Sequence, residues 1–227
     1  MTEKAIIFDS GALISFSMNG ITYLIKELKG IFKGKFLITS EIKKEIIDVP
    51  MKIKRFELEA LKLKQLLDEG ILELPSSLGI KDSEITNQGN KILKIANSTF
   101  QGTRRDLHLL DLGETSCLAL SRILTQKKIK NVLVVDERTT RMLVEKPENL
   151  KSILEKKIHT KISIKQDNLK FFKGFGIIRS SELVYIAYKK GLVKLKDGNV
   201  LNALLYAVKF KGAAISSDEI EEIKRLG

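Results

Sequence analysis

The chain has 227 residues, of which 43% are hydrophobic and 30% charged, enough apolar material for one large domain with a real core. No apolar run approaches the roughly 20 residues that span a membrane, and the first residues lack the layout of a signal peptide, so we expect a cytoplasmic protein without membrane contact. A single cysteine, Cys117, excludes a disulfide or a cysteine-based zinc site within the chain, and two histidines argue against a histidine-rich metal site.

The charge balance is strongly basic. Forty Lys and Arg residues stand against 28 Asp and Glu, a formal net charge of +12. Lysine-rich surfaces are also common in thermophile proteins, but those usually add glutamate alongside lysine. A surplus of bases attracts polyanions, so the composition favours contact with nucleic acid.

The first half of the chain alternates predicted strands and helices. Residues 4–9 form an isoleucine-rich run without polar alternation, which predicts a buried strand of a parallel sheet. The expected elements that follow are a helix over 19–30, a strand over 35–39, a helix over 40–48, a long amphipathic helix over 51–69 and a short strand over 71–75.

The pattern continues with a helix over 91–100, a loop over 100–106, a helix over 111–124 and a strand over 131–136. Strands that alternate with helices in this way indicate an α/β fold. We therefore predict a three-layer α/β/α sandwich with a mostly parallel central sheet.

Beyond residue 150 the pattern changes. Ile158, Ile162 and Ile164 alternate with polar residues before a turn at 167–168, which predicts a β-hairpin. Helices are expected over 180–191, 199–212 and 216–226, the last with Ser216 and Glu219 at capping-box spacing.

We expect two parts in the chain. Residues 1–150 form the α/β domain, with an insert at about 51–110, and residues 151–227 form a hairpin and helical C-terminal extension packed on the core.

Two acidic residues end predicted buried strands. Asp9 follows the first strand and Asp136 follows the strand over 131–136. The carboxyl ends of parallel strands meet at one edge of a sheet, where such folds bind ligands. A turn or a helix cap readily explains one such acid, but two in the same neighbourhood weaken that explanation.

Two glutamates are expected near the same edge. Asp111 and Glu114 open the helix over 111–124 at the spacing of a cap and its reciprocal partner, so capping competes with a functional role. Glu45 follows the second strand, with Glu41 one helical turn earlier as the alternative. The ordinary explanation for Glu45 is a solvated position on an amphipathic helix.

Asp9, Glu45, Glu114 and Asp136 would repel one another unless a positive charge lay among them. Mg²⁺ or Mn²⁺ accepts oxygen ligands of this kind and keeps water for a phosphate substrate. Such a metal would activate water and neutralise charge on a phosphodiester, so the four acids in a basic protein suit hydrolysis of a polyanion.

These motifs resemble those of the PIN-domain ribonucleases. The match lies in "IIFDSGALI", "LITSEIKKEI", "LDLGETSCLALS" and "VLVVDERTTR", which carry Asp9, Glu45, Glu114 and Asp136 in the family's order over residues 4–145. The third and fourth motifs are most similar to a subgroup related to toxin–antitoxin ribonucleases, and the segment "GFGIIRSSELVYIAYKKGLV" resembles that subgroup's tail.

The resemblance implies an α/β/α sandwich, dependence on Mg²⁺ or Mn²⁺, and endonucleolytic cleavage of single-stranded or structured RNA by the four acids. An antitoxin-like protein partner and a homodimer stay open. Two departures stand out: residues 51–110 are longer than in compact toxin-type members, and Val135 stands where members commonly have Thr, Ser, Asn or Asp. The single cysteine excludes the zinc ribbon of the family's ribosome-maturation branch.

Residues around the acids have two interpretations each. Ser10 either bonds Asp9 or a phosphate or shapes the turn, and Asp111 is a helix cap or a partner behind the metal ligands. Arg138 and Arg141 either hold RNA phosphates or begin an exposed helix.

Two other functions compete with the nuclease. A phosphatase with Asp9 as nucleophile is disfavoured, because "DSG" lacks a second Asp two residues on. A non-catalytic RNA- or protein-binding module on a PIN-like scaffold is disfavoured because all four acids are present.

Overall fold

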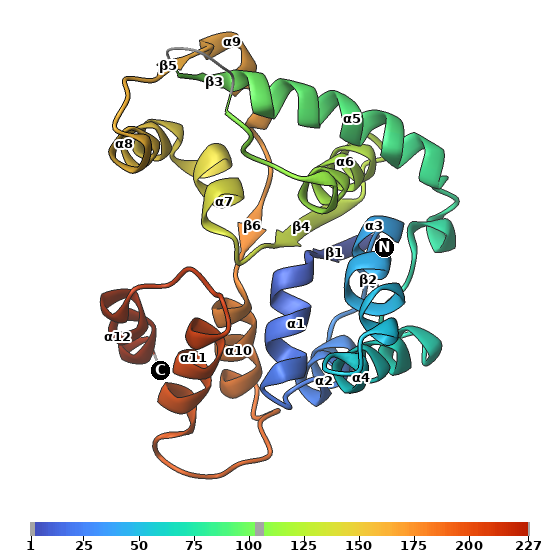
Figure 1. The fold of residues 1–227 in the computed structure, drawn as a ribbon. Coiled ribbons are helices and arrows are strands. Elements are labelled where there is room, and N and C mark those ends of the chain that lie inside the picture. Colours follow the sequence, from blue (N-terminus) through green and yellow to red (C-terminus); the bar gives the residue numbers. More distant parts are fainter. Residues whose placement is uncertain (1–2, 103–106, 227) are drawn as a thin grey trace.

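A four-stranded, wholly parallel sheet lies at the centre of this computed structural model, which describes residues 3–102 and 107–226 (Figure 1). Its spatial order is β2-β1-β4-β6. The strands are β1 (Lys4–Phe8), β2 (Lys35–Leu37), β4 (Lys130–Val134) and β6 (Ile177–Ile178).

Strand β1 lies between β2 and β4, and its residues 5–8 are buried. Ile7 lies opposite Leu37 of β2 and Leu133 of β4, and all three side chains are fully buried. Apolar runs without alternation are what a parallel sheet covered on both faces requires. The predicted strands over 4–9, 35–39 and 131–136 are confirmed.

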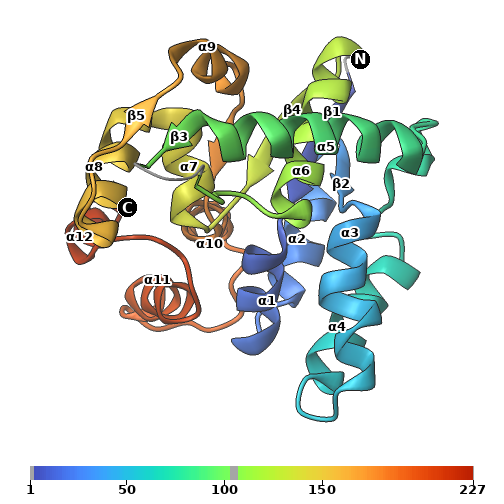
Figure 2. The same cartoon turned by 45° about the horizontal axis from the view of Figure 1, so that its top comes forward.

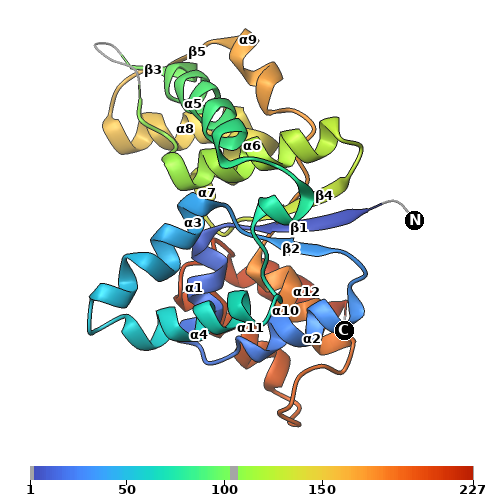
Figure 3. The same ribbon diagram turned by 90° about the vertical axis from the view of Figure 1, so that its right-hand side faces the viewer.

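Helices lie on both faces of the sheet (Figure 3). One side carries α5 (Asp82–Thr99), α6 (Leu112–Gln126), α7 (Arg138–Glu145) and α8 (Pro147–Ile158). The other side carries α1 (Ser10–Met18), α2 (Tyr23–Ile31), α4 (Glu57–Asp68), α10 (Ser180–Lys189), α11 (Val200–Phe210) and α12 (Ser217–Arg225). The α/β class with a parallel central sheet is confirmed, and the arrangement is compatible with a three-layer sandwich.

The helix expected over 91–100 begins earlier, at Asp82. Its Gly89 packs on α6, where a Cβ would make an ordinary contact 3.7 Å from the carbonyl oxygen of Thr115. Of the loop expected over 100–106, Phe100–Gln101 forms the short strand β3, and residues 103–106 lie outside the described residues.

In the insert, the expected helix is present with a later start, and the expected strand is wrong. The helix expected over 51–69 begins at Glu57, because Pro50–Lys52 forms a 3-10 turn and Ile53 is extended. The strand expected over 71–75 is a single bridge between Leu37 and Glu73.

The predicted β-hairpin is also wrong. Ile158 ends helix α8, and Gln166–Leu169 forms helix α9 where the turn was expected. Between them, strand β5 (Ser163–Ile164) pairs antiparallel with β3, not with a neighbouring strand. Alternation of isoleucines indicates an extended segment, but it carries no information on which distant segment pairs with it.

Helices are confirmed in each of the three C-terminal ranges, and the Ser216–Glu219 capping box is present. Strand β6 pairs with β4, and one apolar core includes Leu133 and Val184, so the sheet and core draw on residues on both sides of position 150. Within the described ranges, no helix combines the length and apolarity needed to traverse a bilayer.

Candidate functional site

The order of the sheet reverses its direction between β1 and β4. From β1 the chain moves to β2 on one side and later returns to add β4 on the other, so the winding direction reverses between β1 and β4. Ligands of open α/β sheets bind outside the strand ends at such a reversal. Asp9 follows β1 and Asp136 follows β4 by one further residue, which puts both at this position.

Gly11 separates the two aspartates in space. A Cβ at Gly11 would lie 3.8 Å from the Cβ of Asp136 and 3.8 Å from Oδ2 of Asp9. The backbone amide of Asp9 donates to the carbonyl of Val134 at 3.0 Å, which ties the end of β1 to β4. The two acids that end predicted strands therefore lie beside each other.

Asp9 is almost entirely buried, with 4% of its surface exposed. Burial, and next the charge of Glu45, raise the pKa of Asp9 to about 7, while the nearby amides of Ser10 and Gly11 oppose the shift. It occupies the N-cap position of α1, yet its side chain makes no capping hydrogen bond. Asp9 is thus a buried acid that does not cap α1, and the backbone amides of Ser10 and Gly11 stabilise its charge only in part.

Glu45 reaches Asp9 from an irregular helical turn. Helix α3 (Ser40–Lys43) passes into a π-helical turn over Lys44–Asp48, in place of the regular helix expected over 40–48. The Ser10 hydroxyl donates to Oε1 of Glu45 at 3.0 Å, whereas Glu41 accepts from Thr86 at 3.5 Å. Glu41, before the π-helical turn, and Glu45, within it, therefore have different partners, and Glu45 is the one near Asp9.

Partial desolvation raises the pKa of Glu45, the Ser10 hydroxyl lowers it, and the charge of Asp111 raises it. Figure 2 shows α1, α3 and α6 gathered around the end of β1, and contacts join α3 to α6 and the π-helical turn to α1. Because the Ser10 hydroxyl donates to Glu45, it orients Glu45, and only the backbone amide of Ser10 acts on Asp9.

Glu114 belongs to a complete capping box at the start of α6. Its amide donates to Oδ1 of Asp111 at 3.1 Å, and its Oε2 accepts from the Asp111 amide at 2.9 Å. Burial first, and then the charges of Asp111, Glu137 and Asp9, raise the pKa of Glu114 to about 8, against the effect of the Asp111 amide. The capping role predicted for Asp111 is confirmed. The same capping box holds Glu114 near enough to Asp9 for the charge of Asp9 to raise its pKa.

Asp136 is held from the C-terminal part of the chain. Its Oδ1 accepts from the Ser180 amide at 2.8 Å, and its buried Oδ2 has no hydrogen-bond partner among the described residues. Burial raises the pKa of Asp136, and the amide and then the hydroxyl of Ser180 lower it; the charge of Glu182 raises it and that of Arg141 lowers it. A buried carboxylate oxygen without a partner is costly and indicates a site built for a ligand.

The donor set fits a hard divalent cation. Asp9, Glu45, Glu114 and Asp136 all offer carboxylate oxygens, the ligands that Mg²⁺ and Mn²⁺ prefer. In their present rotamers, no three Asp, Glu, His or Cys side chains of the described ranges stand together at metal-ligand spacing. Adjustment of the flexible side chains of Glu45, on the π-helical turn, and Glu114, on α6, would be needed to close a coordination shell.

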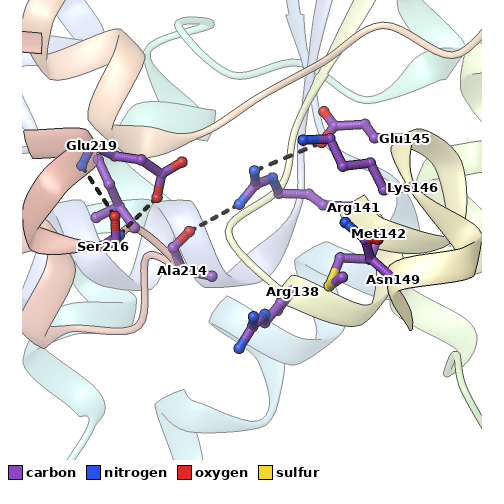
Figure 4. Close-up of a pocket in the computed structure, with 10 residues that line it drawn as sticks. Arg138, Arg141, Met142, Glu145, Lys146, Asn149, Ala214, Ser216 and Glu219 are labelled. Atoms are coloured by element: carbon purple, nitrogen blue, oxygen red, sulfur yellow. Dashed lines mark hydrogen bonds and ion pairs between the residues drawn. The ribbon is translucent and has the colours of Figure 1, made fainter. Parts of the chain in front are cut away.

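The two arginines after Asp136 differ. Arg141 is only 16% exposed in its side chain; its Nη1 donates to the carbonyl of Ala214 at 2.9 Å, and its Nη2 lies 3.7 Å from Glu145 (Figure 4). Arg138 is exposed and has no hydrogen bond or ion pair within the described residues. Arg141 is thus engaged in the structure, and Arg138 is free to meet a ligand.

Two participants were not among the predicted residues. Glu137 contributes to the raised pKa of Glu114, and Ser180 donates its amide to Asp136. Glu137 was detectable as a second acid directly after a strand-end acid. Ser180 donates its backbone amide and its hydroxyl also lowers the pKa of Asp136, but nothing in the local sequence indicates that Asp136 is its partner.

Comparisons with protein-family models, with curated proteins and with solved structures returned no match to this chain.

Proposed function

We propose that this protein is a metal-dependent endoribonuclease with a PIN-like fold. The observation that carries the proposal is the position of Asp9 and Asp136 at the reversal of strand order, with Glu45 and Glu114 in electrostatic contact with Asp9. The four motifs that resemble PIN-domain ribonucleases contribute these four residues in the family's order.

Asp9, Glu45, Glu114 and Asp136 would hold Mg²⁺ or Mn²⁺. When bound, such an ion supplies activation of water and neutralisation of charge on the phosphodiester. The residues behind the ligands orient them: Ser10 holds Glu45, and the Ser180 amide holds one oxygen of Asp136 so that the other is left for a ligand.

The basic surface supports RNA as the substrate. A net charge of +12 raises the local concentration of a polyanion around an acidic centre that would otherwise repel it. An antitoxin-like partner, a homodimer and a cytoplasmic location remain predictions that accompany the resemblance.

Cleavage of end-labelled RNA with Mg²⁺ or Mn²⁺, with and without chelator, tests the proposal. Asp136→Asn and Glu45→Gln are expected to lower the rate by about 100-fold or more, because each removes a charged ligand. Glu41→Gln is the matched control, since Glu41 lies one turn from Glu45 but bonds Thr86, and it should keep the parent rate.

Cleavage that persists in chelator, or an unimpaired Asp136→Asn variant, would contradict the mechanism. RNA binding by the parent without any cleavage would favour a binding module on the same scaffold.

Gly113→Ala is expected to lower the cleavage rate about tenfold while changing the free energy of unfolding by less than about 1 kcal/mol. A Cβ at Gly113 would lie 2.9 Å from Oε2 of Glu45 and 3.4 Å from Oδ1 of Asp111, so the mobile end of Glu45 must move. Gly89→Ala is the control, because nothing lies closer than 3.7 Å to its Cβ. Equal rates for the two variants, measured alongside urea denaturation, would refute the crowding of Glu45.

A further inference from the structure

A cleft of about 420 Å³ opens between α7 with the start of α8 and the segment that leads into α12 (Figure 4). The side chains that matter for its chemistry are Arg138, Met142, Lys146, Asn149, Ile215 and Ser216.

The cleft adjoins the end of β4. Arg138 stands two residues after Asp136, and the amide of Ala214, which lines the opposite wall, donates to the backbone carbonyl of Asp136 at 3.2 Å. A ligand in the cleft would therefore lie on the β6 side of Asp136, along the same edge of the sheet as the four acids.

The negative charges of the cleft are matched internally. Glu145 lies 3.7 Å from Arg141, and Glu219 accepts from Arg179 at 2.8 Å. Arg138 and Lys146 are exposed and have no ion-pair partner among residues 3–102 and 107–226, so the cleft presents two free cations to a ligand.

We propose that this cleft binds one nucleotide of single-stranded RNA adjacent to the bond that is cut, with Arg138 holding a phosphate. The position next to the cut bond rests on the proposed function. Arg138 supplies a planar fork of donors that suits a phosphate, and Met142 and Ile215 offer apolar surface for the sugar or base. The volume suits a single unstacked nucleotide, and a base held within a duplex could not enter it.

The test measures binding without cleavage. A labelled single-stranded oligoribonucleotide is titrated in chelator and followed by fluorescence anisotropy at several salt concentrations. Arg138→Ala is expected to weaken binding about tenfold and to reduce the slope of log affinity against log salt by about one, as for loss of one phosphate contact. Lys127→Ala removes the same charge from an exposed position before β4, at the opposite edge of the sheet, and should change affinity by less than twofold.

The outcomes separate this inference from the proposed function. Equal weakening by Arg138→Ala and Lys127→Ala would overturn the cleft as a specific site, even if the parent cleaves RNA. Selective weakening by Arg138→Ala in a protein that never cleaves would support the nucleotide site and refute the nuclease. A duplex RNA probe with the same dependence on Arg138 would overturn the assignment to a single strand.

Discussion

Asp9→Asn is expected to raise the free energy of unfolding by about 3 kcal/mol at pH 8 in chelator, although it removes a residue that the proposed reaction needs. Burial and the charge of Glu45 raise the pKa of Asp9 from 3.8 to about 7. A tenfold change in an ionisation equilibrium is worth about 1.4 kcal/mol, so ionising this buried acid at pH 8 costs up to about 4 kcal/mol. Asparagine keeps the shape and never ionises.

The sign of the pH dependence follows from the direction of the shift. A carboxyl whose folded pKa is raised contributes most to stability below its unfolded pKa, and that contribution is lost as the pH rises through its folded pKa. The parent should therefore lose stability between about pH 4 and pH 7 from this group, and Asp9→Asn should lose less. Urea denaturation at a series of pH values, with the metal removed, measures the difference.

A divalent cation should make the parent, and not Asp9→Asn, the variant with the higher free energy of unfolding. Mn²⁺ that binds the ionised site stabilises the folded parent in proportion to its occupancy, and it should leave Asp9→Asn nearly unchanged. Asp167→Asn is the matched control, because Asp167 is exposed and paired with Lys170. Parallel pH profiles for the parent and Asp9→Asn would contradict the burial cost, and equal stabilisation of both by Mn²⁺ would contradict the assignment of Asp9 as a ligand.

Arg179→Met is expected to destabilise the protein by about 3 kcal/mol at pH 7. The Arg179 side chain is 11% exposed and bonds Glu182 at 2.6 Å, Glu219 at 2.8 Å and the carbonyl of Ala214 at 3.4 Å. Methionine fills similar volume but leaves two carboxylates and a carbonyl without their cation. The loss of one partner from a buried charge network costs more than the loss of an exposed pair.

The destabilisation caused by Arg179→Met should be smaller at low pH. Burial raises the pKa values of Glu182 and Glu219, but the bonds from Arg179 to both, and the Ser216 amide to Glu219, bring them below their ordinary value. The stability that these groups contribute is therefore lost as the pH falls. Lys170→Met breaks an exposed pair and should cost less than about 0.5 kcal/mol. Urea denaturation of both variants at pH 7 and pH 4 tests this, and equal costs for the two at pH 7 would refute the network.

The parts of the fold that could be predicted are those with strong local patterns. The apolar run of β1 and the capping spacing of Asp111 with Glu114 each depend on nearby residues alone. The expected hairpin failed because β5 pairs with β3, more than sixty residues away, and an extended segment of two residues has no local signal for that partner.

The candidate site divides in the same way. The approach of Asp9 to Asp136 followed from the rule that parallel strands end at one edge. Glu45 was expected near that edge from its place after the second strand, but the sequence left Glu41 open as the alternative. The different roles of Arg138 and Arg141 were not predictable, since only the fold brings Ala214 to Arg141. The Ser180 amide was equally hidden, because any residue except proline would supply it from that backbone position.

The groups that bond Asp136 from the C-terminal part of the chain affect the order in which the site forms during synthesis. They are the Ser180 amide, the Ala214 amide and, behind them, the contact between Arg179 and Glu219, all more than forty residues after Asp136 in the chain. A ribosome-bound chain that has exposed β1, β2 and β4 still lacks them, since synthesis delivers the N-terminal elements first. The acidic centre is therefore completed late, and a partly made chain, still close to the RNA that encodes it, holds Asp136 without its supports.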